Sequence, residues 1–221
     1  ETALSSSLRQ NDAAKNALRQ TLATYDSPVY LFAGILHKDI GADGKITYGN
    51  SLSVFDRAGT EISRYDKSHL VPFGEYIPFS QFIPLDPIVN FSGFTTGKGV
   101  QTQHVDGLPP FSPLICYEVI FGGNVTQGNP RPSWIVNVTN DGWYGDSPGP
   151  YQHFAQARFR AIEEGIPVVR SANTGLSGVI DSLGREVYRS TLMTQDAPDV
   201  MLPMFAMSQP IYSRLVGLFQ K

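Results

Sequence analysis

A single cysteine stands in this sequence where a nucleophile can be exposed. Cys116 ends the apolar run 111–116 and is followed by a carboxylate at Glu118 and by the loop residues Gly122 and Gly123. A buried strand that ends in a cysteine and passes into a glycine-containing loop presents the thiol at the edge of a sheet. Because a thiol with a pKa of about 8.5 is mostly protonated at neutral pH, it needs a neighbouring base or cation to act as a nucleophile.

The chain holds residues that meet this need. Lys67 lies at the end of another expected strand, and Glu1, Glu75 and Glu118 are candidate bases. A carboxylate can accept the thiol proton, and a lysine ammonium can stabilise first the thiolate and then the oxyanion of a tetrahedral intermediate. A set of Glu, Lys and Cys can therefore carry out acyl transfer, and this chemistry requires neither a metal nor another cofactor.

Each of these residues also has a purely structural interpretation. Cys116 could pack as a core thiol, and Lys67 could be a solvated surface charge. Glu1 could be a frayed end, and Glu75 could cap a helix or join an ion pair. Glu118 could order the turn or Lys67 instead of moving protons. We favour the catalytic interpretation because a strand-end thiol, a strand-end cation and several carboxylates converge in one chain.

Strands and two amphipathic helices must position these residues. Helical spacing of apolar residues predicts one helix through Leu22, and a second is expected from Pro150, with Phe154, Ala157, Ala161 and Ile162 on one face. The expected strands cover 29–35, 48–55, 61–65, 111–116, 134–139, 167–171, 176–181 and 187–188, with turns at 41–44 and 182–185. Strands interleaved with helices predict an α/β or α+β layered domain.

The stretch 71–99 differs from the rest of the chain. It holds Pro72, Pro78, Pro84 and Pro87, which argue against regular structure. It also holds many apolar residues, namely Phe73, Tyr76, Phe79, Phe82, Ile83, Leu85, Ile88, Val89, Phe91 and Phe94. Long apolar loops are uncommon and usually functional, so we interpret this stretch as a lid or binding segment. The alternative is a loop that folds back to cover the core.

Composition bounds the possible functions. With 221 residues, 41% of them hydrophobic and 17% charged, the chain is long enough for one globular domain with a sizeable core. The net charge of −3 gives no basic field, so nucleic acid is not an expected partner. The one cysteine excludes an intramolecular disulfide, and the four histidines show no metal-binding spacing. No run of about 20 apolar residues occurs.

Two of these stretches resemble the lysine and cysteine motifs of the nitrilase, or carbon–nitrogen hydrolase, superfamily. They are Tyr65-Asp66-Lys67 and Ile115-Cys116-Tyr117-Glu118. Longer stretches resemble the apolipoprotein N-acyltransferase family within it, namely 67–78, 140–145, 149–154, Arg158 with Ala161, and 170–175. The resemblance covers the chain from Glu1 to about Tyr212.

The resemblance implies a role for each candidate residue. Cys116 would form an acyl thioester, Lys67 would stabilise the oxyanion, and Glu1 would be the general base. Supporting roles around the active site fall to Glu75, Tyr117 and Glu118. Contacts to the substrate are expected from Trp143, Tyr144, Phe79 and Phe82.

The resemblance also implies a fold and a setting. The fold would be α+β, a four-layer α-β-β-α sandwich of the nitrilase type, formed by one catalytic domain over residues 1–221. Family members move a fatty acyl chain from a phospholipid to the N-terminal amine of a diacylglyceryl-cysteine lipoprotein. They work at the bacterial inner membrane with the catalytic domain on the periplasmic side. Because the chain opens on Glu1 and not on Met, we expect it to be a piece of a longer protein. Family members carry transmembrane segments before and after this domain, so the resemblance implies that such segments lie outside the chain and that 71–99 contacts lipid.

Two other functions fit parts of the same pattern. A soluble amidase or nitrilase would use the same Glu-Lys-Cys set with water as the acyl acceptor, but it would not need the Phe- and Pro-rich stretch. A lipid-binding or scaffold domain without activity could keep the fold, but it would not need Lys67, Cys116 and Glu1 together.

Overall fold

The computed structural model describes residues 1, 3, 12–76 and 94–219. The chain forms two compact units. The N-terminal unit comprises residues 2–99, and the C-terminal unit comprises residues 100–221 together with Glu1. Much of the predicted lid, including Phe79 and Phe82, lies outside the described residues, as does the part of the first predicted helix before Asp12.

The N-terminal unit is built on a three-stranded antiparallel sheet in the order β1-β2-β3. Its strands are β1 (Leu31–Ile40), β2 (Ile46–Phe55) and β3 (Glu61–Asp66). The first strand starts at Leu31, later than predicted, and continues to Ile40. It extends beyond its predicted end because β1 and β2 pair along their full length as a hairpin around the predicted turn 41–44. The apolar pattern that defined the prediction stops where this hairpin leaves the core.

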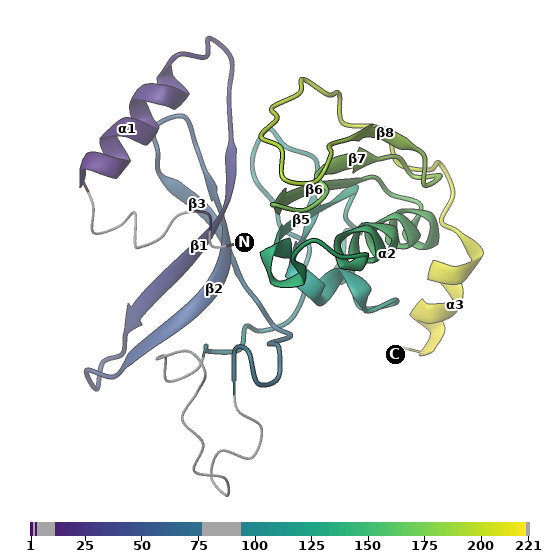
Figure 1. Ribbon diagram of the computed structural model, residues 1–221, viewed down its shortest axis with the longest axis horizontal. Helices are drawn as coiled ribbons and strands as arrows, with labels where there is room; N and C mark the ends of the chain where they lie inside the picture. The colour runs from purple at the N-terminus through teal and green to yellow at the C-terminus, as the bar shows by residue number, and fades with distance from the viewer. Residues whose placement is uncertain (2, 4–11, 77–93, 220–221) are drawn as a thin grey trace, which may run out of the picture. The chain divides into compact units, whose positions relative to one another are not determined.

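The helix α1 (Asp12–Ala23) lies across one face of this sheet (Figure 1). Its residues Ala14 and Leu18 pack against a small core formed by Ala33, Ile35 and Phe55. The 3.6-residue repeat of α1 and the two-residue repeat of β1 thus point their apolar side chains at each other.

The C-terminal unit is built on a five-stranded mixed sheet in the order β4-β5-β6-β7-β8. Its strands are β4 (Phe111–Ile115), β5 (Trp134–Asn140), β6 (Val168–Asn173), β7 (Gly178–Ile180) and β8 (Glu186–Arg189). The first three run parallel, and the last two are antiparallel additions. Nearly every residue of β4 and β5 is buried, as expected for parallel strands that are covered on both faces, although β4 stands at the edge of the sheet.

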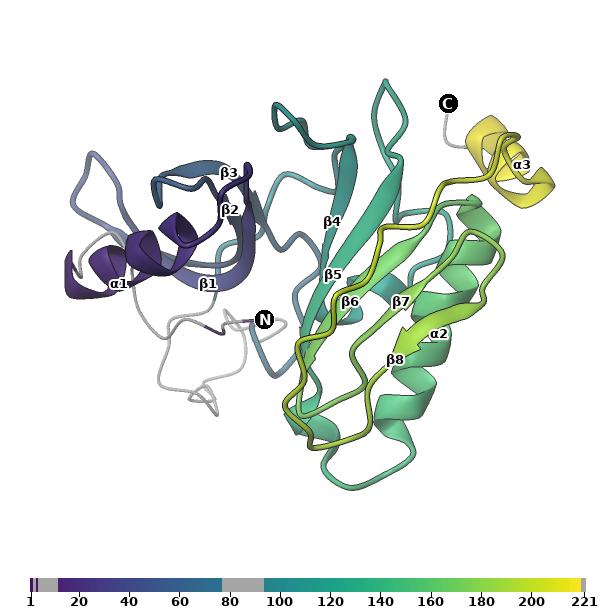
Figure 2. The same cartoon turned by 90° about the horizontal axis from the view of Figure 1, so that it is seen from above.

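The helix α2 (Gly149–Glu164) runs along one face of this sheet (Figure 2). As predicted, Pro150 stands in its first turn, and Gly165 ends it with a left-handed φ of 63°. Ile162, predicted on the buried stripe, is instead 42% exposed. The buried stripe of α2 continues from Ala161 to Glu164. Ile162 follows Ala161 directly, and successive helix residues are rotated by about 100°, so its side chain lies outside this stripe.

A third helix, α3 (Ile211–Phe219), contacts α2 and has no counterpart among the predicted elements. Its buried residue is polar Ser213, while Ile211, Leu215 and Leu218 are exposed. Because its apolar residues do not face the core, their spacing gives no signal of a core-facing helix.

The carboxyl ends of the three parallel strands lie at one edge of the five-stranded sheet. Cys116 follows β4, Asp141 follows β5 and Thr174 follows β6. In open α/β sheets this edge is where ligands bind, because loops and helix starts converge there. The strand order therefore brings residues that are far apart in the sequence to one place.

We predict that the N-terminal unit depends on the absence of a side chain at Gly97. A Cβ at this position would lie 1.9 Å from the backbone oxygen of Asp66, where the Gly97 N–H donates to the oxygen of Lys67 at 2.8 Å. Overpacking of this kind costs about 1–3 kcal/mol, so Gly97→Ala should lower the urea midpoint at an unchanged m-value. Gly74→Ala is the control, since its Cβ would meet Val71 at 3.4 Å. Equal midpoints for the two variants would contradict the prediction.

Candidate functional site

Cys116 occupies a strained turn at the end of β4. It is the first residue of the 3-10 helix η2 (Cys116–Ile120) and has a φ of 54°, in the left-handed region. A non-glycine residue in such a conformation costs about 1–3 kcal/mol, and such residues cluster at functional sites. Cys116 is 9% exposed, so its thiol lies close beneath the surface at the carboxyl edge of the sheet.

Two side chains fix the backbone on either side of this turn. Glu118, which is 2% exposed, accepts a hydrogen bond from the N–H of Ile115 at 2.8 Å. Asn137 of β5 donates through Nδ2 to the carbonyl oxygens of Leu114 at 3.2 Å and Cys116 at 3.3 Å. Glu118 thus contacts the turn, one of the alternatives considered for it. Asn137 was not among the predicted site residues.

Lys67 and Glu75 meet in the N-terminal unit. Lys67 directly follows β3, is 1% exposed, and places its Nζ 2.9 Å from Oε1 of Glu75. Glu75 also accepts hydrogen bonds from Nδ2 of Asn50 at 2.9 Å and from the N–H of Val71 at 2.8 Å. Removing one partner of such a buried pair leaves an uncompensated charge, at a cost of about 3–5 kcal/mol. Glu75 therefore holds the ammonium of Lys67 in one place.

Glu1 belongs to the C-terminal unit and lies at its carboxyl edge. Its Oε2 accepts a hydrogen bond from the N–H of Asn140, the last residue of β5, at 3.1 Å. The carboxylate is half-buried. The structure thus places Glu1 at the end of the strand that neighbours β4, on the same edge as Cys116.

The predicted aromatic contacts have different environments. Tyr117 packs edge-on against Phe121, with ring centroids 5.2 Å apart. Trp143 and Tyr144 belong to the 3-10 helix η3 (Asp141–Tyr144) and are 80% and 40% exposed. Partial burial, followed by the charges of Cys116 and Asp141, raises the pKa of Tyr144 above its usual value.

A buried charged cluster beside the turn was missed as a functional element. Arg170 of β6 and Asp141 form an ion pair of 2.8 Å whose side chains are both 0% exposed. Nδ1 of His153, from α2, lies 2.9 Å from Oδ1 of Asp141. The available signal was an arginine directly after the apolar pair Val168 and Val169 in a predicted strand, because a buried arginine requires a partner.

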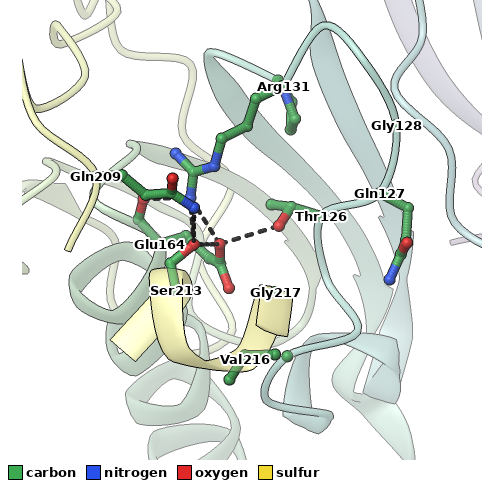
Figure 3. Close-up of a pocket in the computed structure, with 11 residues that line it drawn as sticks. Thr126, Gln127, Gly128, Arg131, Glu164, Gln209, Ser213, Val216 and Gly217 are labelled. Carbon is green, nitrogen blue, oxygen red and sulfur yellow. Dashed lines mark hydrogen bonds and ion pairs between the residues drawn. The ribbon is translucent and has the colours of Figure 1, made fainter. Parts of the chain in front are cut away.

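A separate cavity of ≈ 340 Å³ lies near the other end of α2 (Figure 3). Oε2 of Glu164 accepts hydrogen bonds there from Arg131 at 2.7 Å, Thr126 at 2.9 Å and Ser213 at 2.9 Å. None of the predicted site residues lines this cavity. The hydrogen bond from Ser213 of α3 to Glu164 of α2 joins the two helices, so the polar groups of this cavity have a structural role.

Neither a metal cluster nor a membrane-spanning helix occurs in the part of the chain that the structure describes. No group of three or more His, Cys, Asp or Glu side chains is placed there to hold a metal ion. No helix within those residues combines the length and the apolar character needed to cross a bilayer.

We predict a pH-dependent stability contribution from Asp141. Burial favours a higher pKa for this carboxyl, but the His153 hydrogen bond and the charge of Arg170 outweigh burial and hold the pKa below its ordinary value of 3.8. A carboxyl with a lowered folded-state pKa stabilises the fold above its ordinary pKa, and this contribution is lost as the pH falls through the lower, folded-state pKa.

The stability difference between the natural chain and Asp141→Asn should therefore be constant near neutral pH and shrink as the pH falls below 3.8. Urea unfolding at a series of pH values measures this difference. A difference that stays constant down to the lowest pH at which the chain folds would contradict the assignment.

Known proteins resemble this chain in sequence over most of its length. A model of the carbon–nitrogen hydrolase family matches residues 10–196. Relatives named apolipoprotein N-acyltransferase include that of Rhodopseudomonas palustris, 45% identical over 170 residues, which are 75% of this chain and 32% of that protein. The one from Bradyrhizobium diazoefficiens is 48% identical over the same shares, and that of Brucella melitensis is 43% identical over 86% of this chain and 36% of its own length. The chain spans about a third of the length of these relatives.

Solved structures resemble the fold at low sequence identity. A carbon–nitrogen hydrolase from Helicobacter pylori G27 is 18% identical, with a TM-score of 0.58 over 82% of this chain and 64% of that chain. An amidase from Nesterenkonia sp. is also 18% identical, with a TM-score of 0.52 over 83% of this chain and 64% of that one. The predicted fold class, α+β of the nitrilase type, is thereby confirmed. With the family model matching most of its length, the chain belongs to the carbon–nitrogen hydrolase family.

Proposed function

We propose that this chain is the catalytic domain of an N-acyltransferase that moves a fatty acyl chain from a phospholipid to a lipoprotein. The acceptor would be the N-terminal amine of a diacylglyceryl-cysteine. The observation that carries the proposal is the 43–48% identity, over three quarters or more of the chain, to relatives named apolipoprotein N-acyltransferase. The Cys116 turn and the buried Lys67–Glu75 pair also support it, because acyl transfer through a thioester needs a nucleophilic thiol and a cation.

The first half of the reaction is acylation of Cys116. Glu1 accepts the thiol proton, and the thiolate attacks the ester carbonyl of the phospholipid. The ammonium of Lys67 stabilises the resulting oxyanion, which requires that Lys67 and Cys116 share one pocket. The ester C–O bond breaks, the proton returns to the leaving oxygen, and a lysophospholipid departs.

The second half transfers the acyl group to the amine. The α-amine of the acceptor attacks the thioester carbonyl, the C–S bond breaks, and an amide forms. Glu1 accepts the proton that the amine loses, and the thiolate of Cys116 is restored. No metal or redox partner is needed for either half, since both are displacements at an acyl carbon.

Supporting roles follow from the contacts of the remaining residues. Glu75 would fix the ammonium of Lys67 through their 2.9 Å ion pair, and Glu118 would fix the turn through the N–H of Ile115. Tyr117 packs against the same 3-10 helix as Cys116 and would line the site beside the thiol.

The proposal also places the enzyme at the bacterial inner membrane, with this domain on the periplasmic side. Exposed aromatic side chains would contact acyl chains there. Phe73 is 60% exposed and Tyr76 is 40% exposed, at the start of the predicted lid, and Trp143 is 80% exposed beside the carboxyl edge of the C-terminal unit. The same contacts are proposed for Tyr144, Phe79 and Phe82.

The first prediction concerns the thioester. Incubation of the natural gene product in its membranes with phospholipid should add the mass of one fatty acyl group to the peptide that carries Cys116, because this is the only thiol of the chain. Peptide mass mapping after mild acid quench measures this adduct, and hydroxylamine should remove it. Continued acyl transfer by Cys116→Ala would overturn the proposal. Rapid hydrolysis of small amides without lipid would instead favour a soluble amidase.

The second prediction concerns the cation. Loss of one preorganised oxyanion donor slows acyl transfer by about 10²- to 10³-fold, so Lys67→Met should slow thioester formation by that factor. Lys98→Met is the control, because Lys98 is an exposed lysine of the same unit. Stopped-time acylation assays compare the two variants. Equal rates for both would remove Lys67 from the mechanism.

A further inference from the structure

The backbone of Cys116 raises a question that the proposed triad does not answer. Asn137 answers part of that question, because it binds the backbone on both sides of the turn. Its Nδ2 donates to the carbonyl oxygen of Leu114 at 3.2 Å and to that of Cys116 at 3.3 Å. These hydrogen bonds act on a residue whose φ of 54° is disfavoured for a side chain with a Cβ.

The amide of Asn137 can serve this purpose in only one of its two orientations. A rotation by 180° would place Oδ1 against the two carbonyl oxygens, and an amide oxygen cannot donate a hydrogen bond to them. Arg170 selects the correct orientation, because its Nη1 donates a hydrogen bond to Oδ1 of Asn137. The two residues are register partners on β5 and β6, and Leu114 is the register partner of Asn137 on β4.

Arg170 is itself fixed on every side. Its Nε donates to the oxygen of Leu176 at 3.3 Å, and its Nη2 donates to both oxygens of Asp141, at 3.1 and 2.8 Å. Burial lowers the pKa of this guanidinium, while the charges of Asp141 and Cys116 act in the opposite direction. A Cβ at Gly175 would lie 2.1 Å from Oδ2 of Asp141, so only glycine there leaves space for this carboxylate.

We propose that Arg170 is a positioning residue that acts through Asn137 to hold the Cys116 backbone, and hence the thiol, in its reactive orientation. The proposal rests on Cys116 being the nucleophile of the proposed function. Arg170 touches no reacting group, since all three of its nitrogens are bound to the protein. Stability alone gives little reason for a buried ion pair, because apolar residues of similar volume often serve as well or better.

The test separates positioning from stability by three substitutions. Asn137→Asp keeps the shape and the acceptor for Arg170, but it replaces the donor to Cys116 with an oxygen. Arg170→Lys keeps a positive charge beside Asp141, but it lacks the planar fork that orients Asn137. Arg131→Met is the control, because it breaks another arginine–carboxylate ion pair of the same unit, with the buried Glu164.

Two rates are measured on the natural gene product at a temperature well below the melting point of every variant. One is alkylation of Cys116 by iodoacetamide, and the other is thioester formation with phospholipid. Misplacement of a reacting group by about 1 Å costs about 10²-fold, so we expect kcat to fall by about that factor in Asn137→Asp and Arg170→Lys while KM changes less than about twofold. Alkylation should slow in both variants, and Arg131→Met should retain both rates.

The outcomes distinguish this proposal from the proposed function. Arg170→Lys should recover more stability than Arg170→Met without recovering the rates, whereas a purely structural role would restore both together. Rates equal to those of the natural chain in folded Asn137→Asp, or equal slowing by Arg131→Met, would overturn the positioning role. Slowed alkylation in Asn137→Asp would support it even if the natural chain formed no thioester with phospholipid.

A fourth variant keeps the test decisive if the single changes do not fold. The double substitution Arg170→Met with Asp141→Leu removes both charges together, so no unpaired charge is left buried. We expect this variant to fold and still to react slowly at Cys116. Full reactivity of its thiol would overturn the proposal.

Discussion

The left-handed backbone of Cys116 is the constraint on which the candidate site depends. Turning the chain directly after Ile115 brings the thiol to the carboxyl edge of the sheet. The conformation costs about 1–3 kcal/mol in a residue that has a Cβ, so it persists only if its surroundings determine it. Glu118 binds the N–H before the turn, and Asn137 binds the carbonyl after it. The turn is therefore held by side chains that bind the backbone on either side of it.

In both units the described residues include a buried ion pair that belongs to the proposed machinery or lies next to it. Lys67 pairs with Glu75 in the N-terminal unit, and Arg170 pairs with Asp141 in the C-terminal unit. Such pairs are weak sources of stability, but they fix the direction of a charged group closely. Their proposed uses differ, because Lys67 would meet the reacting carbonyl directly, whereas Arg170 has all its nitrogens bound to the protein and would position the thiol through Asn137.

Local patterns predict much of the framework but not the network behind the thiol. The strand before Cys116 and the helix between Pro150 and Gly165 follow from apolar runs and from proline and glycine signals. The helix α3 escaped prediction because its buried face carries Ser213 and its apolar residues point outward. The partnership of Asn137 and Arg170 depends on the strand order and register of the sheet, which a one-dimensional pattern does not contain. Lys67 and Cys116 were recognisable through motif resemblance more than through periodicity.

The choice of acyl acceptor must lie outside the groups that hold the thiol. An acyl thioester on Cys116 would be the same intermediate whether water or an amine completes the reaction, and the hydrogen bonds described for Glu118 and Asn137 join them to other groups of the protein. Side chains that select an acceptor have to be exposed near the carboxyl edge, as Trp143 and Tyr144 are. A lipid-linked amine presents apolar chains that aromatic surfaces bind, and water presents none. The difference between an acyltransferase and a hydrolase of this family is therefore to be sought in the exposed aromatic residues around η3 rather than in the Glu-Lys-Cys set.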